Sequence, residues 1–232
     1  MKTFLGVLAA GVFFFLFSCE SVDPLKKYPN MVANADPVSA GTITVQFDRF
    51  LSSKLSKNEI EVIFYPRLNA VALEFKYELI TNRQFWDEAS RIKFAEALNH
   101  YKTDYAERSL IDKYRKTRAV YGKVNGRTEW ESFKFAKTRV AYPVIELGYR
   151  FRDEMPFFST LMRSSKEIDE NSDNSSLTDS QQIPMYFTRA QADDLVKLFD
   201  QSYLVGLLNL KDEPQPAPGE EGDNYREFND YR

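Results

Sequence analysis

The segment Ile60–Leu79, with the sequence IEVIFYPRLNAVALEFKYEL, decides the fold class of this chain. Apolar and polar residues alternate from Val71 to Leu79, which is typical of a half-buried strand. Ile60–Tyr65 is a more continuously apolar strand before it. Between them Pro66–Asn69 can turn the chain, because proline presets φ for a turn and cannot donate to a strand ladder. The segment therefore predicts an antiparallel hairpin.

Further strands are predicted on both sides of this hairpin, from alternation and apolar runs. A polar stretch, Leu51–Asn58, is expected to be a loop. Asn125–Gly126 predicts a tight hairpin, because a type I′ turn needs positive φ at both central residues. The predicted strands are Thr42–Phe50, Arg118–Val124, Thr128–Phe135, Ala141–Arg152 and Phe157–Met162.

Two helices are expected. The first follows the third strand and runs from a cap at Thr81 or Asn82 to about Glu107, with apolar residues every three or four positions. The second starts at the capping-box pattern Thr188–Gln191. The apolar segment Tyr203–Leu210 fits either a helix continuation or a short strand. Together these elements predict an α+β fold: a mainly antiparallel sheet of six or seven strands, covered by helices in two layers.

The 232 residues suit a single domain at 42–210, and a hydrophobic content of 43% is enough for a core. Residues 164–182 predict a mobile acidic loop, and residues 211–232 a disordered acidic tail. Residues 19–41 contain three prolines and no apolar periodicity, which predicts a flexible tether.

The first residues, MKTFLGVLAAGVFFFLFSC, predict export from the cytoplasm. A lysine at position 2 precedes the apolar run Phe4–Phe17, the pattern of a secretory signal peptide over residues 1–18. The run is shorter than the roughly 20 residues that a membrane-spanning helix needs.

Leu16-Phe17-Ser18-Cys19 resembles the lipobox of bacterial lipoproteins. The resemblance implies cleavage before Cys19, a diacylglycerol on its thiol and acylation of its new amine. It also implies an extracytoplasmic domain anchored by lipid in the cell envelope. The alternatives are an ordinary cleaved signal or an uncleaved anchor, with Cys19 incidental. Cys19 is the only cysteine, so an intrachain disulfide is impossible.

His100 is the only histidine, with Glu96 and Asp104 one helical turn to either side. This spacing could orient a general base or hold a metal ion. It is also the ordinary spacing of charged partners on a helix surface, and we favour that interpretation. No GxSxG motif accompanies the histidine.

Asp169, Asn171 and Asp173 alternate as in a calcium-binding loop, but Asn174 and Ser180 stand where glycine and glutamate are needed. No phosphate-binding or dinucleotide-binding glycine motif is present. We therefore predict no metal, no cofactor and no catalytic residue.

The segment from Tyr101 to Arg139 mixes aromatic and basic residues, with Lys113, Arg115, Lys116 and Arg118 densest. Export argues against nucleic acid as its partner, and an anionic lipid or a glycan is more consistent.

The sequence thus favours an envelope lipoprotein with a non-enzymatic domain that binds a protein, lipid or glycan. One alternative is a hydrolase of an envelope polymer that uses strand-borne carboxylates such as Glu74 and Glu146. Another is an assembly factor whose sheet edge pairs with a partner strand.

Overall fold

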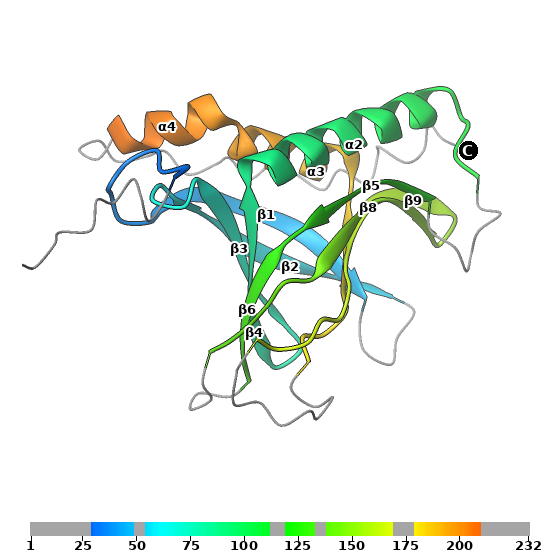
Figure 1. The fold of residues 1–232 in the computed structure, drawn as a ribbon. Coiled ribbons are helices and arrows are strands. Elements are labelled where there is room, and N and C mark those ends of the chain that lie inside the picture. Colours follow the sequence, from blue (N-terminus) through cyan, green and yellow to red (C-terminus); the bar gives the residue numbers. More distant parts are fainter. Residues whose placement is uncertain (1–28, 49–53, 112–118, 133–137, 169–178, 210–232) are drawn as a thin grey trace, which may run out of the picture.

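The computed structural model describes residues 29–48, 54–111, 119–132, 138–168 and 179–209 (Figure 1). Within these ranges the chain forms ten strands and three helices. In chain order they are β1 Val38–Asp48, β2 Leu55–Tyr65, β3 Ala70–Tyr77, β4 Ile80–Asp87, α2 Glu88–Ala106, β5 Ala119–Asn125, β6 Arg127–Ser132, β7 Arg139–Ala141, β8 Val144–Arg152, β9 Met155–Met162, β10 Ile183–Phe187, α3 Arg189–Phe199 and α4 Gln201–Asn209.

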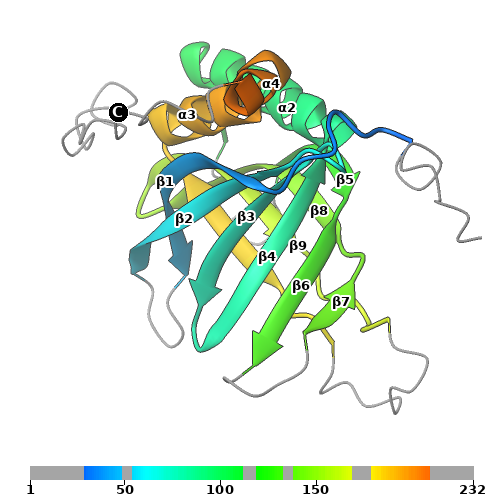
Figure 2. The ribbon, with the colours of Figure 1, turned by 90° about the vertical axis from the view of Figure 1, so that its left-hand side faces the viewer.

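All ten strands form one antiparallel sheet with the order β5-β8-β9-β10-β1-β2-β3-β4-β6-β7. The sheet curves into a half-barrel, and α2, α3 and α4 lie across one end of it, the upper end in Figures 1 and 2. The α+β class and the antiparallel pairing are confirmed. The expected six or seven strands were too few, and the two-layer form is not confirmed, because the sheet is strongly curved.

The predicted β2–β3 hairpin is confirmed, with Tyr65 opposite Ala70 across the turn. Strands β1 and β2 both begin earlier in the chain than predicted. Residues 55–58 belong to β2 rather than to a loop, and residues 38–41 belong to β1 rather than to a flexible tether. Gly41 lies at a bulge in β1 and has a φ of 135°, a conformation that favours glycine.

The predicted tight hairpin at Asn125–Gly126 is wrong. Asn125 lies opposite Val144 and Thr128 lies opposite Ala141, so β5–β6 and β7–β8 keep a single register across the junction. The amide of Gly126 donates to the carbonyl of Pro143 at 2.9 Å. These four strands are therefore one long hairpin, bent at Gly126.

The bend sends the two halves of this hairpin to different neighbours. β6 pairs with β4, whereas β8 pairs with β9. In the strand order β5 and β7 stand at the two ends of the sheet. The bent hairpin therefore links the two ends covalently, and the sheet must curve to accommodate it.

The first helix begins later than predicted, because Thr81 and Asn82 lie in β4. Phe85 packs on the convex face with Ala70 and Ala72, whereas Trp86 lies in the main core. Consecutive side chains on opposite faces are the pattern of a strand. Asp87 caps α2 instead, accepting from the amide of Ser90 at 2.8 Å.

The C-terminal part contains a strand that the sequence did not indicate. β10 pairs with both β1 and β9, directly before the capping box of Thr188 and Gln191, which is confirmed. The segment after Tyr203 is helical, in α4. The described ends of the predicted mobile loop are held together, since Ser180 donates its amide to the carbonyl of Ser165 at 2.8 Å. Residues 169–178 and 211–232 lie outside the described residues.

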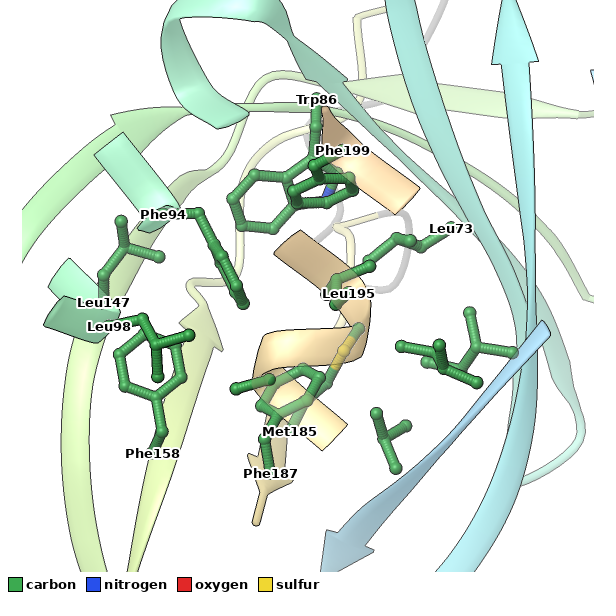
Figure 3. Close-up of a cluster of buried hydrophobic side chains, with 14 of the residues drawn as sticks. Leu73, Trp86, Phe94, Leu98, Leu147, Phe158, Met185, Phe187, Leu195 and Phe199 are labelled. Carbon is green, nitrogen blue, oxygen red and sulfur yellow. The ribbon is translucent and has the colours of Figure 1, made fainter. Parts of the chain in front are cut away.

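Aromatic rings fill the space between the half-barrel and the helices (Figure 3). Phe94 of α2 is at the centre, with its ring 5.2 Å from that of Phe158 on β9 and 5.4 Å from that of Phe199 on α3. Trp86 of β4 meets the same ring edge-on at 5.8 Å. One side chain of α2 thus contacts the sheet on both sides of the half-barrel and the helix beside it.

We expect Gly148→Ala to destabilise the domain severely. A Cβ atom at Gly148 would lie 1.9 Å from the carbonyl oxygen of Ala119, beside the bulge between β5 and β8. Backbone must then move, at a cost of about 3 kcal/mol or more. Gly206→Ala in α4 is the matched control, since nothing lies within 4 Å of its Cβ position. It should gain about 0.5–1 kcal/mol from helix propensity. Urea unfolding measures both, and equal stability of the two variants would contradict the proposed close approach.

Candidate functional site

The convex face of the sheet carries a row of paired charges on β3, β4 and β6. Arg83 lies directly opposite Glu74 on one side and Glu129 on the other. Its Nε donates to Glu74 at 2.8 Å, and its Nη1 donates to Glu129 at 3.2 Å. Burial opposes the charge on Arg83, but the two carboxylates outweigh it and raise the pKa of this guanidinium. Arg127 also pairs with Glu129 and lies over the ring of Phe85.

A second convex group surrounds Tyr186 of β10, which is fully buried. The Tyr186 hydroxyl donates to Asp48 at 2.8 Å, and Arg152 pairs with the same carboxylate. The Arg152 guanidinium also lies over the Tyr186 ring, 5.4 Å from its centroid. Together these contacts join β1, β8 and β10.

The third convex group centres on Glu146 of β8, whose side chain is 10% exposed. Arg163 donates to it at 2.8 Å, and Lys123 of β5 lies 3.4 Å away. Burial alone would raise the pKa of this carboxyl, but the hydrogen bond and charge of Arg163, with Lys123, hold it below its usual value.

These groups show where the two carboxylates named for the hydrolase alternative lie. Glu74 and Glu146 both point to the convex face, and β9, β10, β1 and β2 lie between their strands. Each is engaged by arginine. A hydrolytic pair needs two carboxyl groups about 5–10 Å apart across a substrate site. The structure does not bring these two together.

His100 is exposed on α2 and stacks on Tyr121 of β5, with ring centroids 6.0 Å apart. Asp104 accepts from the Tyr121 hydroxyl at 2.6 Å. Burial, together with this hydrogen bond to a carboxylate, raises the pKa of Tyr121. Of the two carboxylates considered as partners of His100, Asp104 therefore accepts a hydrogen bond from the tyrosine. Among the described residues no group of three or more His, Cys, Asp or Glu could hold a metal ion.

The other residues that the sequence analysis considered lie outside the described residues. They are the lipidation site Cys19, the alternating residues Asp169, Asn171 and Asp173, and the basic residues Lys113, Arg115, Lys116 and Arg118.

The structure adds a buried arginine that sequence reasoning missed. Arg91 of α2 is only 3% exposed, and its Nη2 donates to Gln201 of α4 at 2.7 Å and to the side chain of Asn69 at 3.2 Å. Burial lowers the pKa of Arg91, and the carboxylates of Glu88, Asp87 and Asp200 oppose that shift. Arg91 thus joins α2, α4 and the β2–β3 turn. An arginine beside an apolar helical stripe gives no sequence signal of such burial.

The segment before β1 is also attached to the domain. Val32 donates its amide to the carbonyl of Pro66 at 2.9 Å, and Arg67 donates from Nε to Asn34 at 2.9 Å. Arg67 also approaches Asp36 at 3.4 Å. We call residues 31–37 the N-terminal strap. It holds the chain against the β2–β3 turn, where the sequence predicted only a flexible tether.

The sequence matches one protein family over residues 38–206, from the first residue of β1 into α4. The chain belongs to this family, which is described as "Uncharacterised Treponema protein". No curated protein and no solved structure matches the chain. Of the helices in the described ranges, none combines the length and the apolar character that crossing a membrane requires.

Glu146 should make stability depend on pH. The folded protein holds the pKa of this carboxyl below its ordinary value of 4.5. The ionised carboxylate therefore contributes fully to the free energy of unfolding above pH 4.5, and this contribution is lost as the pH falls through the folded pKa. We expect Glu146→Gln to be less stable than wild type at pH 7, with the difference shrinking as the pH falls below 4.5. Glu59→Gln, at an exposed position of β2, should stay within about 0.5 kcal/mol of wild type throughout. Urea titrations at a series of pH values measure this, and a constant difference for Glu146→Gln would contradict it.

Arg91→Met should loosen α4 selectively. The variant leaves acceptors of Asn69 and Gln201 without their donor, at a cost of about 1–3 kcal/mol. Hydrogen exchange of α4 amides should accelerate more than that of β2 and β3 amides. Ile92→Met is the matched control, because Ile92 is the next residue of the same helix and is 54% exposed. Unchanged exchange in α4 would show that Arg91 does not hold this helix.

Proposed function

We propose that this chain is a lipid-anchored protein of the bacterial cell envelope, whose domain binds a partner and is not an enzyme. The observation that carries the anchor is the N-terminal sequence, a signal-peptide pattern ending at Cys19. The family description supports the bacterial assignment, since Treponema is a bacterial genus.

The charge pairing on the convex face supports the binding role. The acids that the sequence offered for catalysis are held by arginine in cross-strand contacts. A general acid or base needs a proton position that is free to exchange with substrate. These carboxylates instead stabilise the sheet, which favours binding over the hydrolase alternative. An envelope protein, a lipid and a glycan remain the candidate partner classes.

Fatty-acid labelling in the bacterial host tests the anchor. Wild-type protein should incorporate labelled palmitate and co-sediment with membranes, whereas Cys19→Ala should carry no label and leave the membrane fraction. Ser21→Ala, two residues after Cys19, is the control that should behave as wild type. Label on Cys19→Ala, or none on the wild type, would overturn the proposal.

A further inference from the structure

The anchor and the domain are joined by a short chain that leaves from one defined end. The strap fixes the chain to the β2–β3 turn from Val32 onward. Residues 20–31, twelve in number, separate Cys19 from that point. Whatever its conformation, a chain of this length spans at most about 43 Å. The β2–β3 turn is therefore the part of the fold most closely tied to the lipid.

α4 lies at the same end of the molecule. The hydroxyl of Tyr203 donates to the carbonyl of Ala40 at 2.8 Å, and β1 starts there beside the end of β2, with Val38 opposite Phe64. Figure 1 shows α4 above the dark-blue strap. The helix Gln201–Asn209 contains no Asp, Glu, Lys or Arg.

The outward side of α4 suits a headgroup layer. Val205 is 37% exposed and Tyr203 is 36% exposed, and Ser202 is exposed beside them. A helix without charged side chains has no charged group to dehydrate when it approaches lipid. The surface is small, so it supports contact with the headgroups while the acyl chains at Cys19 supply the attachment.

The other end of the half-barrel lies far from this surface. β3 begins after the β2–β3 turn and ends before the β3–β4 turn, and its eight residues span about 26 Å. Leu79 in the β3–β4 turn is 80% exposed, the highest value among the large apolar side chains described. Lys76, near the same end of β3, is also exposed.

We propose that the end formed by the strap, the β2–β3 turn and the outward side of α4 faces and contacts the membrane surface. The β3–β4 end, with Leu79, then points away from the lipid. This orientation rests on the proposed lipidation of Cys19, which supplies the membrane and the tether.

Site-specific labelling tests the orientation, because Cys19 is the only cysteine and its thiol is blocked once lipidated. Val205→Cys and Ser202→Cys place one free thiol at the proposed contact, and Leu79→Cys and Lys76→Cys place it at the far end. Each acylated protein is labelled with a fluorophore and inserted into phosphatidylcholine vesicles with a headgroup nitroxide quencher. Zwitterionic lipid is used because anionic headgroups would repel the acidic residues that follow Asn209 in the sequence.

We expect quenching several-fold stronger at positions 202 and 205 than at 76 and 79. Equal quenching at the two ends, or stronger quenching at 76 and 79, would overturn the orientation. Flotation of the same samples separates this failure from that of the anchor. Protein that floats with vesicles but shows equal quenching refutes only the orientation. Protein that carries no acyl label and does not float refutes the lipidation, and the orientation with it.

Discussion

The half-barrel depends on one hairpin whose two strands serve both ends of the sheet. Asn125–Val144 and Thr128–Ala141 are pairs in the same register, on either side of the contact between Gly126 and Pro143. A flat sheet cannot hold β6 beside β4 and β8 beside β9 while these strands remain continuous. Curvature is therefore a consequence of pairing, and the bend falls where a glycine faces a proline, residues that tolerate a break in regular strand structure.

Curvature creates the need for the helices. The concave face of the half-barrel is apolar, and without the helices it would be exposed at the end that they cover. α2 and α3 supply large rings that reach both sides of the curve, with Phe94 between Phe158 and Phe199. Aromatic pairs of this kind combine a large buried area with favourable edge-on geometry. With one cysteine in the chain, such packing must provide the stability that disulfides give many exported domains.

The local sequence pattern correctly predicted those helices and strands whose structure depends mainly on their own residues. Alternation in Ile60–Leu79 gave the β2–β3 hairpin, and Thr188 with Gln191 gave the start of α3. Prediction failed where distant pairing decides the outcome. Asn125–Gly126 has the composition of a tight turn, yet both flanking strands have long-range partners that hold it extended. Thr81 and Asn82 can cap a helix, but pairing with β3 and β6 keeps them in a strand.

The candidate site was harder to predict for a related reason. Alternation correctly placed Glu74 and Glu146 on the polar face of their strands, but it gave neither the strand order nor the curvature that separates them. Arg91 and the strap depend on contacts between segments far apart in the sequence, so no local pattern reveals them. The strap nevertheless links the N-terminal segment to the folded domain. Because the strap fixes where the chain enters the domain, the proposed lipid at Cys19 would constrain which surface of the fold faces a membrane.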